Sequence, residues 1–120
     1  MADLANIGLS EDMRLKLKDM HEGGIFSEMK DGYRLAASIA IKLNFDVESR
    51  DLPRRDNMYD VGGIDDNFIF RNAISEIFPE KKGQEYRHLE KLADAGVEYM
   101  YKFYDGDGVF RIDEFLKDET

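Results

Sequence analysis

The chain has 120 residues, of which 42% are hydrophobic and 36% are charged, and it carries a formal net charge of -9. This length suits one ordinary domain with one core, so we expect residues 1–120 to form a single domain. The sequence contains no cysteine, which excludes disulfides, thiolate zinc sites and cysteine nucleophiles. The acidic balance argues against general affinity for nucleic acids or anionic membranes, and it favours basic protein partners or cations.

Nothing in the sequence predicts contact with a membrane. No apolar run approaches the roughly 20 residues that a membrane-spanning helix needs. Residues 1–7 lack the basic start and the apolar stretch of a secretory signal. We therefore expect a cytoplasmic protein that has no membrane partner.

The first predicted helix begins after Ser10, whose hydroxyl is suited to cap a helix N-terminus. Its apolar residues recur at spacings of four and three, which places them on one face of the helix. These residues are Met13, Leu17 and Met20. The pair Gly23-Gly24 follows, and it favours a left-handed cap that ends the helix.

The second predicted helix runs from Ser27, as its cap, to about Asn44. Its second half, residues 35–41, is apolar nearly all round, and a helix of this kind is buried on more than one side. In so short a chain, it is either the central helix of the domain or part of an interface between subunits. Residues 45–67 then form a predicted long loop, which could contain a short strand or a helical turn.

Two further helices are predicted in residues 68–120. Asp65 or Asp66 can cap the first of them, and Pro79 ends it. The second has apolar or aromatic residues at every third or fourth position, and Gly96 within it indicates close packing against a neighbour. The predicted fold class is therefore all-α.

The N-terminal third of the chain shows a characteristic order of elements. Residues 1–44 contain a short extended start, a helix, a glycine turn and a second apolar helix, and the most distinctive stretches are residues 24–27 and 31–36. This part resembles the ribbon-helix-helix family of small bacterial and archaeal regulators, which implies a homodimer because two strands must pair to form the ribbon. The dimer interface implied on the second helix consists of Leu35, Ala36, Ile39, Ala40 and Leu43. Residues 34–40 are also similar to a segment of the small helical protein of the bacterial DNA sulfur-modification system.

The ribbon-helix-helix resemblance implies DNA binding as one alternative function. In that family the second helix opens with a polar cap that can meet a phosphate, which corresponds here to Ser27, Lys30 and Arg34. However, residues 2–9 hold no lysine or arginine, and residues 10–43 carry six acidic and six basic side chains. DNA binding needs a local excess of positive charge, so this balance argues against it.

Asp105, Asp107 and Glu114 lie near the C-terminus at spacings that resemble an EF-hand calcium loop from its third position onwards. The two aspartates and the bidentate glutamate would supply carboxylate oxygens, and Val109 would supply a backbone carbonyl. Phe103 stands where the first carboxylate of such a loop belongs. A calcium-binding module and a plain Asp-Gly-Asp-Gly turn are therefore the two interpretations of this segment.

No catalytic motif is visible in the sequence, which contains no phosphate loop, nucleophile motif or HExxH. Its two histidines, His21 and His88, have no sequence neighbour that would make either a base or a ligand, and His88 is expected to face solvent. We therefore expect a non-catalytic, dimeric interaction or regulatory protein that has no cofactor and has a protein as its partner. A DNA-binding regulator and a calcium-binding module are the alternatives.

Overall fold

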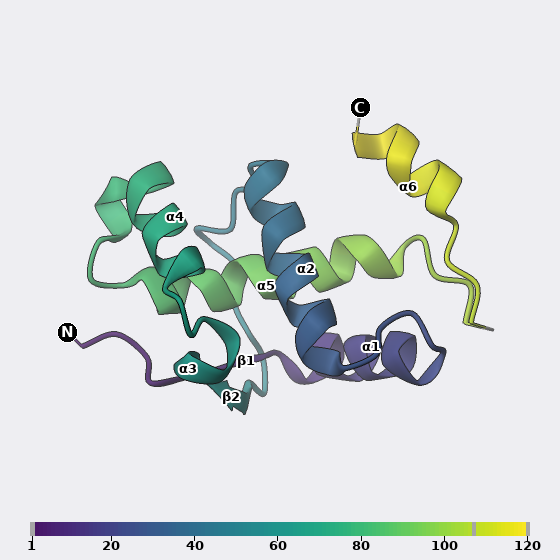
Figure 1. The fold of residues 1–120 in the computed structure, drawn as a ribbon, viewed down its shortest axis with the longest axis horizontal. Helices are drawn as coiled ribbons and strands as arrows, with labels where there is room; N and C mark the ends of the chain where they lie inside the picture. Colours follow the sequence, from purple (N-terminus) through teal and green to yellow (C-terminus); the bar gives the residue numbers. More distant parts are fainter. Residues whose placement is uncertain (1, 107, 120) are drawn as a thin grey trace.

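The computed structural model describes residues 2–106 and 108–119, and the protein is mainly helical, as predicted. In the N-terminal half, the elements are β1 (Asn6–Leu9), α1 (Glu11–Glu22), α2 (Met29–Lys42), β2 (Asp56–Asp60) and α3 (Val61–Ile64). In the C-terminal half, they are α4 (Ile69–Ile77), the short 3-10 helix η1 (Pro79–Lys81), α5 (Glu85–Tyr101) and α6 (Ile112–Glu119). Figure 1 shows α5 running along the long axis of the molecule, with α2 crossing it.

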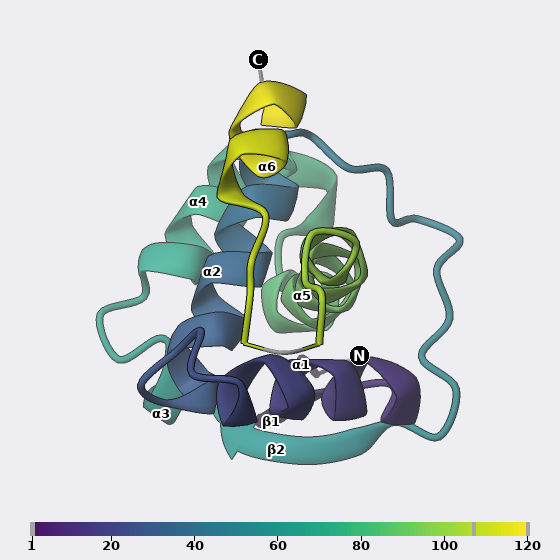
Figure 2. The same ribbon diagram turned by 90° about the vertical axis from the view of Figure 1, so that its right-hand side faces the viewer.

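The centre of the molecule is the crossing of α2 and α5. A Cβ atom on Gly96 would lie 2.0 Å from the carbonyl oxygen of Ala36, so the two backbones pass too close for a side chain at position 96. This contact confirms that Gly96 packs closely against a neighbour. Figure 2 views α5 end-on, with α2 beside it and α1 and the sheet below. The predicted all-round apolar helix is therefore the central helix of one chain.

The first helix forms as the sequence predicts. The backbone N–H of Met13 donates to the hydroxyl of Ser10, which is the N-cap residue of α1. The three apolar residues predicted on one face of this helix are all buried. At the other end, Gly24 has φ +86°, and the N–H of Ile25 donates to the carbonyl of Met20. These bonds satisfy carbonyl groups that the end of the helix would otherwise leave unpaired.

Two features of the N-terminal half differ from the prediction. α2 begins at Met29 with Glu28 as its N-cap residue and no side-chain cap, so Ser27 does not have the predicted capping role. β1 pairs antiparallel with β2 of the same chain, with Ile7 opposite Tyr59 and a register shift after this pair. The order of strand, helix and helix agrees with a ribbon-helix-helix start, but the partner of the strand lies in its own chain.

The segment after α2 is more regular than the predicted long loop, because β2 and α3 lie within it. Beyond α3, Phe68 is the N-cap residue of α4 in place of the predicted Asp65 or Asp66, but Asp65 bonds the first turn of the helix. Its carboxylate accepts hydrogen bonds from the backbone N–H groups of Phe70 (2.9 Å) and Arg71 (3.0 Å). α4 ends two residues before Pro79, which opens η1.

α6 follows a segment in which Tyr104 and Phe110 form an isolated antiparallel bridge. The helix occupies eight residues. Phe115 anchors it, because the centroid of its ring lies 5.5 Å from that of Phe103 and 6.0 Å from that of Tyr99. Across the described ranges, no helix combines the length and the apolar character that a bilayer span requires.

Candidate functional site

Two buried carboxylates of α5 tie the N-terminal elements to this helix. Asp94 accepts hydrogen bonds from both the N–H (2.8 Å) and the hydroxyl (2.9 Å) of Ser10, and its second oxygen pairs with Arg50 Nε at 2.9 Å. One turn earlier, Glu90 accepts from the N–H of Gly8 (3.1 Å) and from Arg55 Nε (2.7 Å). The two acids therefore hold β1, the start of α1 and the segment before β2 in place.

The polar groups around these two carboxylates make hydrogen bonds within the fold. The Tyr33 hydroxyl donates to the carbonyl of Gly8 at 2.9 Å, and burial, followed by the nearby charge of Glu90, raises the pKa of Tyr33 well above its usual value. The hydrogen bond to Glu90 likewise raises the pKa of Arg55. Arg50 lies beside Asp94 and Arg55 beside Glu90, so each buried carboxylate is paired with an opposite charge.

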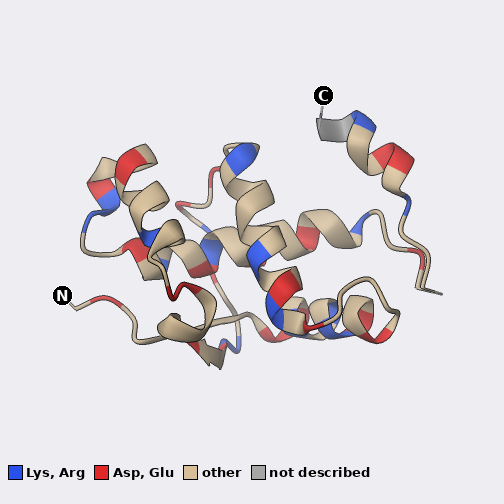
Figure 3. Ribbon diagram, viewed as in Figure 1, with Lys and Arg blue, Asp and Glu red and all other residues tan. Residues whose placement is uncertain are grey.

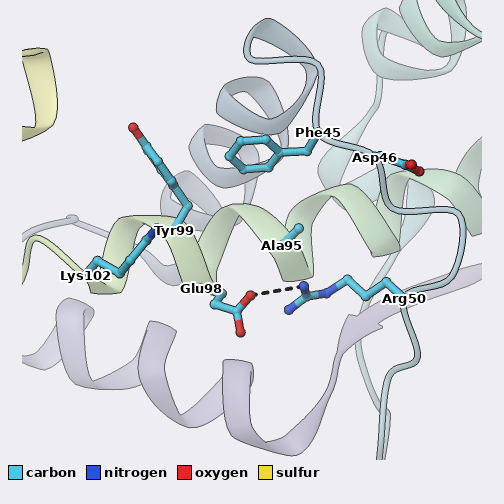
Figure 4. A pocket seen from close by; sticks show the side chains of 7 residues that line it. All are labelled: Phe45, Asp46, Arg50, Ala95, Glu98, Tyr99 and Lys102. Atoms are coloured by element: carbon cyan, nitrogen blue, oxygen red, sulfur yellow. Dashed lines mark hydrogen bonds and ion pairs between the residues drawn. The ribbon is translucent and has the colours of Figure 1, made fainter. Parts of the chain in front are cut away.

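Two hollows flank Arg50. Figure 4 shows the larger one, which has a volume of about 620 Å³. In it, Arg50 and Glu98 pair at 3.2 Å. The rings of Phe45 and Tyr99 meet edge to face, with centroids 5.3 Å apart. Lys102 Nζ lies 5.1 Å from the centre of the Tyr99 ring. The second hollow, of about 360 Å³, opens beside the N-terminus of α1. Ser10 and Asp94 both line this second hollow, and the hydrogen bond between them holds the N-terminus of α1 against α5.

α4 carries an apolar surface that the fold leaves uncovered. One side of α4 faces the core, which includes Ile74 and against which Phe70 and Phe78 pack. The neighbouring side of the helix faces outward. Phe68, Ile69 and Ile77 are 50%, 66% and 52% exposed. Ala73 lies between the two isoleucines at helical spacing. We call the surface formed by Phe68, Ile69, Ala73 and Ile77 the α4 face.

Phe68 occupies an unusual backbone conformation at the start of this surface. Its φ and ψ angles are 57° and 24°, the left-handed region that bulky residues avoid. Its N–H donates to the carbonyl of Asp65, whose buried carboxylate accepts from the first N–H groups of α4 and from the Tyr86 hydroxyl at 3.0 Å. Burial and this last bond raise the pKa of Tyr86 to about 12. Asp65 therefore fixes the turn that presents Phe68 to solvent.

The residues predicted to contact DNA are only partly available. Arg34 donates from Nε to the carbonyl of Ile64 (3.1 Å) and from its terminal nitrogen to the carbonyl of Gly63 (2.9 Å), so it joins α2 to α3. Ser27 is exposed before α2 begins, and Lys30 is half-buried in its first turn. Of the three, Arg34 therefore serves the fold of its own chain.

The predicted dimer surface on α2 is largely used within one chain. Ala36, Ile39 and Ala40 are buried in the core that α2 shares with α5. Leu43 is half-buried and packs against the same core, while Leu35 is exposed. The apolar character that suggested a subunit interface is therefore explained mainly by the α2–α5 crossing.

The predicted calcium ligands contact an arginine. Arg111 Nε pairs with the carboxylate of Asp105 at 3.0 Å, and its guanidinium also contacts Glu114. The carbonyl of Val109 accepts a hydrogen bond from the N–H of Asp105 at 2.9 Å. Asp107 lies outside the described residues. Within the described ones, no three histidine, aspartate or glutamate side chains gather as metal ligands would.

The buried charged groups of α5 were not predicted from the sequence, and His88 lies elsewhere than predicted. This histidine is only 6% exposed and packs against Phe78, with ring centroids 4.7 Å apart, so the expectation that it faces solvent was wrong. The signal for the carboxylates was their position, because Asp94 lies between two alanines and Glu90 lies four residues earlier, one helical turn away. A comparison with protein-family models, curated proteins and solved structures finds no match for this chain.

Proposed function

We propose that this chain is a non-catalytic interaction protein that binds a protein partner through the α4 face. The observation that carries this proposal is the exposure of Phe68, Ile69 and Ile77, three large apolar side chains within residues 68–77. Contiguous exposed apolar surface in a small domain marks interaction sites more often than scattered single residues do. In Figures 1 and 2, α4 lies at the edge of the molecule, where a partner can approach.

The backbone of Phe68 supports the same proposal. An L-residue in the left-handed region costs about 1–2 kcal/mol, and a glycine would adopt the observed angles without this strain. Phe68 combines this unfavourable backbone with a ring that is half in water. Strained residues of this kind cluster at functional sites. A binding role gives a reason for an aromatic side chain at a position where folding alone favours glycine.

The partner that fits the α4 face is a second copy of the chain in an antiparallel arrangement. Ile69 and Ile77 each lie four residues from Ala73, so the stripe reads the same in both directions. A twofold axis through Ala73 would place Ile69 of one copy beside Ile77 of the other, and the small side chain of Ala73 would let the helices approach closely.

A basic side chain borders the α4 face, because the guanidinium of Arg71 lies over the Phe68 ring at 5.5 Å.

Cysteine cross-linking and sedimentation test this proposal directly, because the chain has no cysteine of its own. We expect a concentration-dependent dimer of the 13.9 kDa chain, and Ala73→Cys should form a disulfide dimer on mild oxidation because the twofold brings two copies of position 73 together. Ile69→Asp should abolish the concentration-dependent dimer, and it should also abolish the disulfide when combined with Ala73→Cys. Leu15, an exposed leucine on α1, provides the matched controls Leu15→Cys and Leu15→Asp, which should neither cross-link nor dissociate the dimer.

Two outcomes would contradict the proposal. A chain that stays monomeric into the millimolar range would rule out self-association through this face. A dimer that survives Ile69→Asp with native circular dichroism would place the contact on another surface.

A further inference from the structure

A small basic hollow lies beside the first turns of α5, away from the α4 face. Its volume is about 180 Å³. The residues that line it are Glu80, Lys81, Gln84, Arg87, His88 and Lys91. Three basic side chains against one acidic one give this hollow a positive balance, although the whole chain carries -9. Figure 3 shows basic segments in the connection between η1 and α5 and in the first half of α5.

Two buried nitrogen atoms at this hollow have no hydrogen-bond partner. His88 is 6% exposed and its Nε2 is unpaired, and the Nε of Arg87 is unpaired in the same way. Buried polar atoms are nearly always hydrogen-bonded in folded proteins, so an acceptor beside His88 Nε2 would supply the bond that this atom lacks. The Arg87 guanidinium is otherwise held by a bond from its terminal nitrogen to the carbonyl of Ala2 at 3.4 Å.

The two lysines are held by contacts that an anion can replace. Lys81 pairs with the carboxylate of Glu48 at 2.7 Å, and Lys91 donates to the backbone carbonyl of Glu48 at 3.2 Å. Glu48 is exposed, and exposed ion pairs contribute little to stability. A dianion that enters the hollow can therefore compete with Glu48 for both ammonium groups.

The lowered pKa of His88 agrees with a positive environment around its imidazole. Burial lowers the pKa of this imidazole first, and the charge of Lys81 and then of Lys91 lowers it further, against the opposing effects of Glu48 and Glu80. An oxyanion close to Nε2 would accept a hydrogen bond from the tautomer that carries its proton there. It would also offset the lysine charges.

We propose that the hollow formed by Arg87, His88 and Lys91 with Lys81 binds a phosphate-sized oxyanion, either inorganic phosphate or the phosphate group of a phosphomonoester. Arg87 Nε and the ammonium of Lys91 would donate to its oxygens, and His88 Nε2 would complete the set. Charge-assisted bonds of this kind are the strong ones in phosphate recognition. This site is independent of the proposed self-association, because it uses none of the residues of the α4 face.

The test is an NMR titration of the full chain with inorganic phosphate at constant ionic strength, followed on the amide signals of residues 84–91. We expect saturable shifts centred on these residues. Arg87→Gln and Lys91→Gln should each raise the dissociation constant by about tenfold, the effect of one lost charge-assisted contact. Lys102→Gln is the matched control, because it removes a lysine from the other end of the same helix and should change the constant by less than about twofold.

Titration with O-phosphoserine, with serine as the uncharged reference, distinguishes the two sources of phosphate. Tighter binding of phosphoserine than of phosphate assigns the site to phosphomonoesters, and the reverse order assigns it to the free ion. Shifts that do not saturate would overturn the proposal. An equal loss of affinity in Lys102→Gln and Lys91→Gln would also overturn it, because it would show attraction to general positive charge only.

Discussion

Replacing Phe68 tests whether the turn before α4 is strained, as its φ of 57° indicates. Phe68→Ala and Phe68→Gly lose the same half-buried ring, whose burial contributes about 1 kcal/mol to stability in both cases. They differ in the backbone, because alanine keeps the left-handed penalty of about 1–2 kcal/mol and glycine removes it. Glycine is more flexible in the unfolded chain, and this flexibility lowers the free energy of unfolding by about 0.5–1 kcal/mol. We therefore expect Phe68→Gly to be more stable than Phe68→Ala by about 0.5–1 kcal/mol.

Urea unfolding of the two variants measures this difference, and Leu15 supplies the reference. Leu15 lies inside α1 with ordinary helical surroundings, so Leu15→Ala should be more stable than Leu15→Gly by about 1 kcal/mol. The order of alanine and glycine should thus be reversed between the two positions. If alanine is the more stable variant at both positions, the backbone at Phe68 is not strained and its support for a binding role disappears.

Three further predictions concern the core. In thermal unfolding, Gly96→Ala should destabilise the chain by about 3 kcal/mol, because the new Cβ would lie 2.0 Å from a backbone oxygen of α2. Gly62→Ala is the control and should be neutral, because the nearest atom to its new Cβ lies 3.8 Å away. Asp94→Ala should cost about 3 kcal/mol in urea unfolding, because it leaves the buried N–H of Ser10 without its acceptor and leaves Arg50 with only the exposed Glu98 as an acidic partner. The folded-state pKa of His88 lies below its ordinary value of 6.5, so stability should fall as the pH drops through this value, and His88→Gln should remove that part of the pH dependence.

The parts of the fold that sequence alone predicted are those set by neighbours in the chain. Ser10 caps α1 because a hydroxyl at that position reaches an N–H three residues on. The carboxylate of Asp65 also bonds the first turn of α4, from a position three residues before the N-cap residue Phe68. The glycine pair after α1 ends it through the backbone freedom of Gly24. These are local effects, and they do not depend on what the rest of the chain does.

The partner of an apolar surface could not be predicted in this way. The stretch around Ala36 indicated burial on several sides, and the ribbon-helix-helix resemblance assigned part of that burial to a second chain. The structure assigns it to α5, where Gly96 allows the backbones to meet. Both halves of that contact were visible in the sequence, but periodicity gives no information on which small residues face each other. The ion pairs of Asp94 and Glu90 could not be predicted for the same reason, because their arginines lie 44 and 35 residues away in the sequence.

The α4 face and the basic hollow are joined by η1, and this connection allows the two proposals to be separated. Lys81 lies at the end of η1 and lines the hollow, whereas Ile77 lies at the end of α4 and belongs to the face. Lys91→Gln should therefore weaken phosphate binding and leave the sedimentation of the chain unchanged, while Ile69→Asp should do the opposite. If phosphate instead shifts the dimer equilibrium of the unmodified chain, then linkage requires dimerisation to change phosphate affinity by the same factor. In that case η1 would transmit the coupling, and the two surfaces would be parts of one regulated interface.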